Sequence, residues 1–239
     1  MTAVLPITGI PVAGCPERVV VVGDPARAAK VAERLDDSRS MAAKREYHSY
    51  RGRWNDIEVM VVSHGVGSAG AGVCFSEIIR GGARRIIRAG TCGGLQPDVA
   101  DGDLVVAIGA VRDDGYSRGV VPLAYPAVAD PGITAALQSH APGAHRGIVL
   151  TSDVFYPSAV LGSNLPQWQA AGCIAVEMEC AALFVAASLS GVAAGAVLAV
   201  DGNPLADSDE SMEDYNPDRQ VVADAVSDMI DAGLNALVA

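Results

Sequence analysis

Residues 18–27 read Arg-Val-Val-Val-Val-Gly-Asp-Pro-Ala-Arg, and this stretch decides the fold class. Its consecutive valines form a short β-branched block, the pattern of a strand buried on both faces of a sheet. Gly23 and Pro25 end that strand, and a helix is predicted from Pro25 to about Leu35. Strand, glycine turn and helix in this order indicate an α/β protein.

The same unit recurs along the chain, and this alternation favours a parallel sheet. Strands are predicted at 57–63, 85–89, 104–111, 147–151 and 195–200, and helical segments at 75–79, 176–189 and 219–238. The acidic stretch 206–218 lacks apolar periodicity and is predicted to be a loop. Because no repeat or linker divides the chain, we expect one domain over residues 1–239.

Length and composition agree with one large core. The chain has 239 residues, of which 50% are hydrophobic and 19% are charged. Its 26 glycines and 13 prolines are dispersed, which argues against disorder, collagen and coiled coil. The N-terminus lacks the pattern of a signal peptide, and no apolar stretch has the length of a membrane span. A cytoplasmic location is therefore expected.

The net charge limits the possible partners. The 17 basic and 28 acidic residues give a formal charge of −11, which disfavours nucleic acid and anionic membranes. All basic residues except Lys30 and Lys44 are arginine, whose planar fork suits oxyanions, although codon bias gives the same skew. The 5 cysteines show neither a CxxC pair nor zinc spacing, so no metal is expected.

Two motifs at predicted strand ends have the residues of an anion site, because open α/β sheets bind ligands where strands end. In the first, Gly23 leads into a helix N-terminus that favours an anion, and Arg27 adds charge. In the second, Arg88 ends an apolar strand and Thr91 follows in a Gly-rich turn. The alternatives are an ordinary turn with a surface arginine and a buried structural arginine, which needs a partner to offset its desolvation.

A third motif, His-Gly-Val-Gly-Ser-Ala-Gly at 64–70, matches the GxGxxG fingerprint of dinucleotide-binding proteins. That fingerprint needs an acidic residue about twenty positions later. Glu77 comes too early and Asp98 too late. The glycines therefore fit close backbone approach to another small ligand better, and a dinucleotide-dependent oxidoreductase is kept only as an alternative.

Three carboxylates complete the candidate set. Glu177 and Glu179 head an Ala-rich segment, and we expect them to point in different directions and to have separate tasks. Acids that only complement a helix dipole are the alternative. Asp201 ends the strand predicted at 195–200, where a carboxylate acts as a general acid or merely begins a turn with Gly202.

Taken together, these motifs resemble the nucleoside phosphorylase family that contains the hexameric purine nucleoside phosphorylases and the uridine phosphorylases. The resemblance covers essentially the whole chain and is closest to the parasite-type purine nucleoside phosphorylases. The matching motifs are GDPARA at 23–28, REY at 45–47, SHGVGSAG at 63–70, IIRAGTCGGLQPD at 86–98, SDVFYP at 152–157, VEMECA at 176–181 and VDGNP at 200–204. It implies an α/β domain with a central mixed β-sheet flanked by helices. It also implies phosphorolysis of a purine nucleoside to free base and ribose 1-phosphate, with inorganic phosphate as co-substrate and no cofactor.

The resemblance implies a role for each matching residue. Phosphate would be held by Gly23, Arg27, Arg88 and Thr91, with Arg45 reaching in from a neighbouring subunit, so that the minimum unit is a homodimer and the family's hexamer is expected. The nucleoside would contact Val66, Tyr156, Val176 and Glu177, while Glu179 beside Met178 would bind the ribose hydroxyls. Asp201 would protonate purine N7 as phosphate attacks C1′ from the opposite face.

Two departures from the family bear on the substrate. The family usually places a histidine near the N-terminus against the ribose 5′-hydroxyl, whereas alignment without gaps puts Ile7 there. An apolar residue cannot hydrogen-bond that hydroxyl, so we expect 5′-deoxy or 5′-modified nucleosides such as 5′-methylthioadenosine to be accepted. The stretch 157–172 lacks the arginine that reads uracil in uridine phosphorylases. Purine is therefore favoured, and 6-oxo or 6-amino is left open.

Besides the oxidoreductase, three alternative functions remain: a uridine phosphorylase, a nucleosidase of the same fold that uses water, and a non-catalytic nucleoside-binding protein. The arginines argue against the nucleosidase, because an oxyanion pocket without an oxyanion would leave Arg27, Arg45 and Arg88 unpaired.

Overall fold

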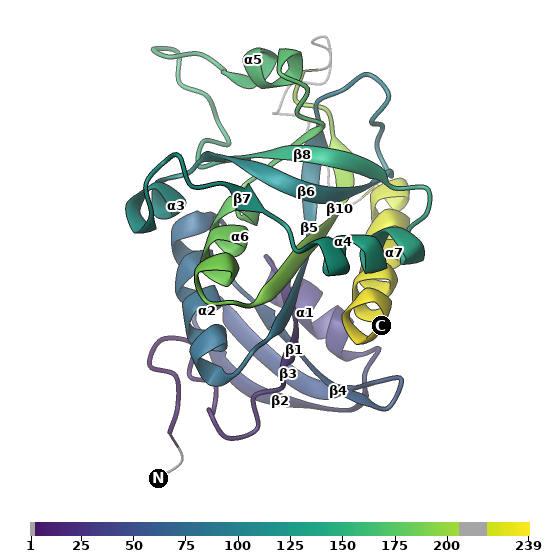
Figure 1. Ribbon diagram of the computed structural model, residues 1–239. Coiled ribbons are helices and arrows are strands. Elements are labelled where there is room, and N and C mark those ends of the chain that lie inside the picture. Colours follow the sequence, from purple (N-terminus) through teal and green to yellow (C-terminus); the bar gives the residue numbers. More distant parts are fainter. Residues whose placement is uncertain (1–2, 206–218) are drawn as a thin grey trace.

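The structure confirms an α/β protein with a mixed sheet flanked by helices. It is a computed structural model that describes residues 3–205 and 219–239 (Figure 1), so the loop predicted at 206–218 lies outside the described residues. The strands are β1 (Arg18–Val22), β2 (Asp36–Lys44), β3 (Tyr47–Trp54), β4 (Ile57–Ser63), β5 (Arg85–Gly94), β6 (Leu104–Asp113), β7 (Ala127–Val128), β8 (His145–Ser152), β9 (Ala175–Glu177) and β10 (Ala193–Gly202). The helices are α1 (Pro25–Ala32), α2 (Ser68–Gly81), α3 (Gly115–Val120), α4 (Pro131–His140), α5 (Leu165–Ala170), α6 (Cys180–Leu189) and α7 (Gln220–Val238).

Parallel pairing occupies the centre of the sheet. β1 pairs in parallel with β4 and β5, and β5 pairs in parallel with β10, as the alternation of strands and helices predicts. Antiparallel contacts of β10 with β6 and of β5 with β9, together with the parallel series β6, β8 and β9, close these strands into a ring. The expectation of a parallel sheet is therefore wrong for these antiparallel pairs, and the mixed sheet implied by the resemblance is confirmed.

Residues 36–54 form an antiparallel hairpin that the sequence patterns did not indicate. β2 is an edge strand that pairs with β3, and β3 continues the antiparallel arrangement to β4. Most residues of β2 are polar and exposed, without an apolar alternation. An edge strand needs no fully buried face, so hydrophobic periodicity does not detect it.

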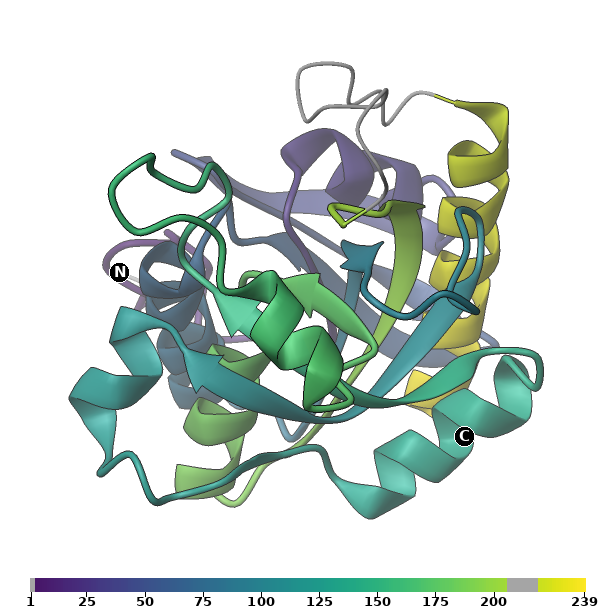
Figure 2. The ribbon, with the colours of Figure 1, turned by 90° about the horizontal axis from the view of Figure 1, so that it is seen from above.

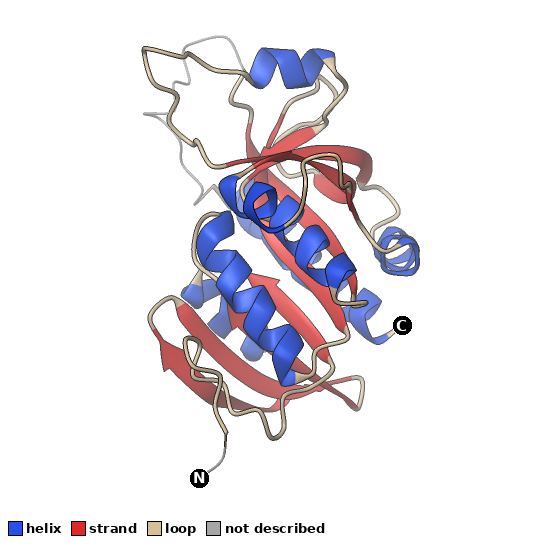
Figure 3. Ribbon diagram, turned by 60° about the vertical axis from the view of Figure 1, so that its left-hand side comes forward, coloured by secondary structure: helices blue, strands red, loops and turns tan. Residues whose placement is uncertain are grey.

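The valine block of β1 packs on both faces of the sheet. Val19 and Val21 contribute to a core that includes α2 and α6, whereas Val20 and Val22 contribute to a core that includes α1, α4 and α7. The view from above separates α2 and α6 from α7 in the same way (Figure 2), and Figure 3 shows the strands between the helices. Burial of one such side chain stabilises the folded state by about 1.5–3 kcal/mol. The buried valines therefore hold this strand, and the start of the turn that follows it, in place.

The helix predicted at 176–189 begins only at Cys180. Residues 175–177 form β9, which pairs with the end of β5. Glu177 ends this strand, and its carboxylate accepts hydrogen bonds from the N–H groups of Glu179 and Cys180. The prediction was wrong because an apolar, Ala-rich run crosses from the strand into the helix without a change of pattern, and periodicity cannot place the boundary.

Candidate active site

One cavity gathers most of the candidate residues at the carboxyl ends of the central strands. Its volume is about 690 Å³, within the usual range of small-molecule sites. The parallel register explains the convergence: Arg88 on β5 lies beside Val21 of β1, and Thr91 lies beside Ala199 of β10. The predicted site residues that line it are Gly23, Arg27, Val66, Arg88, Thr91, Val176, Glu177, Met178, Glu179 and Asp201.

Gly23 and the start of α1 form one wall of the cavity. Asp24 caps the helix through a hydrogen bond from the Ala26 N–H to its carboxylate, 2.9 Å long, and Pro25 occupies the first turn. This leaves the positive end of the helix dipole toward the cavity, where half-buried Arg27 adds its charge. Anion binding at this turn, which the sequence motif indicates, stays a prediction.

Arg88 is the centre of a buried hydrogen-bond network. Its side chain is 4% exposed. Its Nη2 lies 2.6 Å from Glu179 Oε2, its Nε lies 3.2 Å from Glu177 Oε2, and its Nη1 lies 3.1 Å from His64 Nε2. Burial by itself lowers the pKa of a guanidinium, but Glu179 and Glu177 together raise the pKa of Arg88. Arg88 therefore stays charged and held in one orientation.

Glu177 acts as a structural acceptor within this network. Its carboxylate accepts hydrogen bonds from the Thr151 hydroxyl and, at 2.7 Å and 2.9 Å, from the backbone N–H groups of Glu179 and Cys180, in addition to its contact with Arg88. The side chain is fully buried. The expected separation of tasks between the two acids is thus only partial, because Glu177 and Glu179 both contact Arg88.

Glu179 is positioned by the glycine turn at 64–70. The Gly67 N–H donates to its Oε1 at 2.6 Å, and the Ser68 hydroxyl donates to the Met178 carbonyl at 2.7 Å. Gly65 and Gly67 have φ values of 77° and 91°, which favour glycine, so these positions let the backbone reach the carboxylate. Burial raises the pKa of Glu179, and Arg88 lowers it in part. Within the described structure, these glycines serve a close backbone approach.

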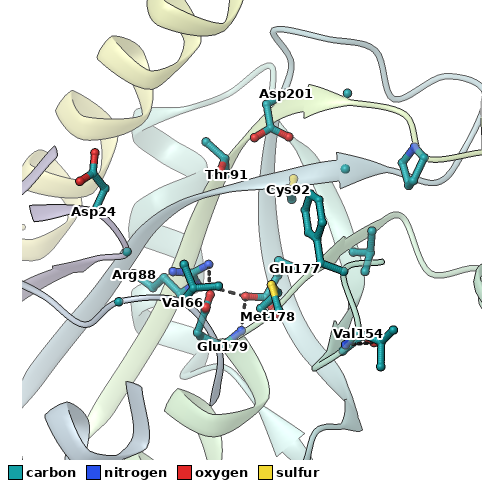
Figure 4. A pocket seen from close by; sticks show the side chains of 18 of the residues that line it. Asp24, Val66, Arg88, Thr91, Cys92, Val154, Glu177, Met178, Glu179 and Asp201 are labelled. Atoms are coloured by element: carbon teal, nitrogen blue, oxygen red, sulfur yellow. Dashed lines mark hydrogen bonds and ion pairs between the residues drawn. The ribbon is translucent and has the colours of Figure 1, made fainter. Parts of the chain in front are cut away.

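Asp201 lies in a separate part of the cavity. Figure 4 shows it beyond Thr91 and Cys92, apart from the cluster of Arg88, Glu177 and Glu179. The residue is 6% exposed and sits near the end of β10. Burial, with a further contribution from Asp201, raises the pKa of the neighbouring Cys92 thiol, which therefore stays protonated. The cavity thus has one part around Arg88 with its paired carboxylates and another part around Asp201.

Three predicted site residues do not line this cavity: Ile7, Arg45 and Tyr156. Ile7 is 40% exposed on the N-terminal segment, where its N–H donates to the Glu77 carboxylate at 2.9 Å. Arg45 is exposed in the turn between β2 and β3. Tyr156 is 73% exposed, while the adjacent Phe155 lines the cavity and packs edge-on against the Tyr156 ring.

Several residues of the site were not singled out from the sequence. His64 opens the motif at 64–70, and its ring contacts Arg88. Phe155 belongs to the quoted motif 152–157, and Asn203 follows Asp201 by two positions. The available signal for Asn203 was its place in the motif at 200–204, directly after Asp201 and Gly202.

Neither a metal centre nor a membrane segment is found in the described part of the chain. No group of three or more His, Cys, Asp or Glu side chains among residues 3–205 and 219–239 has the arrangement of a metal site. Over the same ranges, the helices are too short or too polar to cross a bilayer.

Comparison with known proteins identifies the family. The Phosphorylase superfamily matches residues 17–237. The chain is 37% identical over 223 residues to a purine nucleoside phosphorylase of Plasmodium falciparum (91% of this chain, 89% of the relative). It is 38% identical over 198 residues to a uridine phosphorylase of Treponema pallidum (77% of each). A crystal structure of the Toxoplasma gondii purine nucleoside phosphorylase with immucillin-H matches at a TM-score of 0.92 and 33% identity, over 99% of this chain and 97% of that one. The chain therefore belongs to the phosphorylase superfamily, as a member of the nucleoside phosphorylase family of pentosyltransferases.

Proposed function

We propose that the protein cleaves purine nucleosides with inorganic phosphate, giving free base and ribose 1-phosphate. The observation that supports this most directly is that one cavity holds an anion-favouring helix N-terminus with Arg27 and, in a separate part, the carboxylate of Asp201. Glycosidic cleavage creates positive charge on the sugar and negative charge on the base. A phosphate at one end and a proton donor at the other supply what these charges require.

The proposed roles follow from this arrangement. Gly23, Arg27, Arg88 and Thr91 bind phosphate so that an oxygen attacks C1′ while the bond to the base nitrogen breaks. Glu179 binds the ribose hydroxyls, which holds C1′ in line with the attacking oxygen. Protonated Asp201 gives its proton to N7, so that the base leaves as a neutral molecule. Met178, Val176 and Val66 line the cavity against the nucleoside.

Purine is preferred over uracil in this proposal. The support is the stretch 157–172, which contains no arginine to read the uracil carbonyls. The similar proteins include both a purine nucleoside phosphorylase and a uridine phosphorylase, so uridine is the alternative substrate.

Arg88 does not distinguish a phosphorylase from a nucleosidase. Its charge was expected to be unpaired without an oxyanion, but Glu177 and Glu179 pair it within the chain. The choice of phosphate over water therefore rests on the family match and on the helix N-terminus beside Arg27.

A substrate panel with and without phosphate tests the proposal. Inosine, adenosine and uridine are each incubated with the enzyme, and free base is quantified. We expect base release from a purine nucleoside only when phosphate is present, with ribose 1-phosphate in equal amount. Equal release without phosphate identifies a nucleosidase. Nucleoside binding by titration without release in either condition identifies a non-catalytic binding protein, and NAD(P) binding supports an oxidoreductase.

We also propose that the ribose 5′ position is read by Ile7 of a neighbouring subunit, and that 5′-deoxy or 5′-modified nucleosides are accepted. The support is the apolar side chain of Ile7, which is partly exposed outside its own cavity. The kcat/KM for 5′-methylthioadenosine should exceed that for adenosine. Equal or better kcat/KM with adenosine contradicts this part of the proposal.

Arg45 supports a shared site in the same way, because it is exposed and does not line its own cavity. A homodimer is then the smallest complete unit, and a hexamer of three such dimers is the proposed assembly.

A further inference from the structure

We infer that Asn203 reads the 6-position of the purine and selects a 6-oxo base over a 6-amino base. This inference rests on the proposed function and concerns the part of the cavity where Asp201 lies. Asn203 lines the same cavity as Asp201 and Phe155. It directly follows β10, which ends at Gly202, and lies two residues after Asp201 in the wall of the same cavity.

The turn that carries Asn203 is held against the sheet. Pro204 packs on Gly93 of β5, where a Cβ would lie 2.8 Å from Pro204 Cδ and 3.4 Å from Val176 Cγ1. Only glycine allows this approach without a shift of the turn. Gly202 also pairs with Gly93 in the sheet register. The backbone on both sides of Asn203 is thereby fixed relative to β5, which forms another wall of the cavity.

The orientation of the Asn203 amide is set by its own hydrogen bond. The Leu205 N–H donates to Asn203 Oδ1 at 2.8 Å. The oxygen is therefore engaged, and Nδ2 with its two hydrogens is the group that offers a contact to a ligand. Asn203 thus presents a donor to the cavity.

A donor at this place distinguishes the two classes of purine. N7 and the 6-substituent lie on the same edge of the base, so a side chain beside the proton donor to N7 reaches the 6-position. A carbonyl oxygen at position 6 accepts a hydrogen bond from Nδ2. An exocyclic amino group at that position is itself a donor, so it forms no such hydrogen bond with Nδ2. As the glycosidic bond breaks, negative charge grows on the base, O6 included, until N7 takes its proton, and the amide stabilises that charge at O6.

The neighbouring side chains do not supply this contact. Phe155, Val176 and Pro204 are apolar, and the Cys92 thiol is held protonated and is only a weak donor. The Ser152 hydroxyl accepts from the Val154 N–H at 3.3 Å. Arg219 also lines the cavity, but its Nη2 donates to the Asp201 carbonyl at 2.9 Å and its Nη1 pairs with Asp101. Of the described residues compared in this paragraph, Asn203 is the one that offers an amide donor.

The variant Asn203→Asp tests the inference directly. A carboxylate keeps the acceptor for the Leu205 N–H but replaces the donor by a second acceptor. We measure kcat/KM for inosine and adenosine with saturating phosphate. The wild type should prefer inosine by about tenfold or more, and the variant should reduce that ratio by about tenfold or more, as expected for a mismatched polar group in a site. The variant Asn203→Ala, which adds no charge, controls for an effect of the new carboxylate on Asp201.

Two further variants complete the test. Asn203→Ala removes donor and acceptor together and should bring the ratio toward one. Asn55→Asp makes the same amide-to-carboxylate change at an exposed turn outside the cavity and should leave the ratio unchanged. The inference is overturned if the wild type prefers adenosine. It is also overturned if the inosine-to-adenosine ratio of kcat/KM in both Asn203 variants stays within about threefold of the wild-type ratio.

Binding of the free bases separates failure of this inference from failure of the proposed function. Hypoxanthine should bind the wild type more tightly than adenine, and Asn203→Asp should reverse the order, in a titration that needs no turnover. If no nucleoside is cleaved with phosphate but the bases show this reversal, the proposed reaction is wrong and the role of Asn203 stands. If cleavage requires phosphate but the order of binding is unchanged, the role of Asn203 is wrong and the reaction stands.

Discussion

Arg88 donates a hydrogen bond from Nη1 to Nε2 of His64, with 3.1 Å between the two nitrogens. The other ring nitrogen, Nδ1, lies 2.9 Å from the Gly65 carbonyl oxygen, which can only accept. Nδ1 therefore carries the hydrogen and Nε2 is the acceptor. Burial, and then the charge of Arg88, lower the pKa of His64 well below its ordinary value. His64 is thus a neutral positioning residue that fixes the Arg88 guanidinium.

Replacing His64 should weaken phosphate binding. His64→Leu removes the acceptor and leaves a buried donor of Arg88 unsatisfied, whereas His64→Gln offers a carbonyl oxygen in its place. We expect His64→Leu to raise the KM for phosphate by about tenfold with a smaller change in kcat, and His64→Gln to recover most of the loss. Steady-state kinetics at saturating nucleoside measure both. The same KM in the two variants would show that the hydrogen bond has no role in positioning.

His64 also predicts a dependence of stability on pH. In the unfolded chain its pKa is about 6.5, but in the folded chain it remains neutral to much lower pH, so the unfolded state binds more protons below about pH 6.5. The free energy of unfolding should therefore fall as the pH drops below 6.5, by up to about 1.4 kcal/mol per pH unit from this residue. Urea unfolding at several pH values should give a shallower decrease for His64→Gln. Parallel curves for the two proteins would contradict this assignment.

Glu177 should contribute more to stability than an exposed acid in an ion pair. Glu177→Gln removes the charge that pairs with buried Arg88, and loss of one partner of a buried pair costs about 3–5 kcal/mol. Glu58→Gln is the matched control, because Glu58 pairs with Arg51 but its side chain is 52% exposed. Its effect should stay below about 1 kcal/mol. Chemical denaturation gives both values, and equal effects would rule out the special role of Glu177.

The proposed proton donor is tested with Asp201→Asn. We expect kcat for inosine to fall by about a hundredfold to ten-thousandfold with little change in nucleoside affinity, because only the proton transfer is lost. The nucleoside 7-methylguanosine supplies the control, since its N7 is already methylated and needs no proton. The variant should therefore keep most of its activity on that substrate. A comparable loss on both substrates would assign Asp201 to binding or folding.

Arg45 tests the proposed shared site. Arg45→Ala should raise the KM for phosphate by about tenfold, as expected for one lost charged contact, while unfolding behaviour and the nucleoside KM change little. Light scattering on the same samples reports the assembly. A wild-type monomer with full activity would show that Arg45 does not act on a neighbouring subunit.

Much of the fold and many residues of the candidate site were accessible from the sequence. The valine block at 18–22, the glycine turn after it and the helix beginning at Pro25 depend on neighbours within a few residues, and local patterns predict them correctly. Asp201 likewise lies near the end of its strand, as predicted. Arg88 and Thr91, predicted at a strand end and in the turn after it, lie instead within β5, which continues to Gly94. The edge hairpin at 36–54 was not predicted, because its exposed strand carries no apolar pattern.

The network around Arg88 was decided only by the tertiary structure. His64, Glu177 and Glu179 come from different parts of the chain, and 24 residues separate His64 from Arg88 while 89 separate Glu177 from it. A sequence pattern identifies each charged or polar residue but does not show which partner satisfies it. That depends on how the strands carrying these residues pair, because β5, β9 and the end of β4 must meet before a buried guanidinium finds its acceptors. Burial then forces the pairing, since a charge removed from water is stable only where such acceptors surround it.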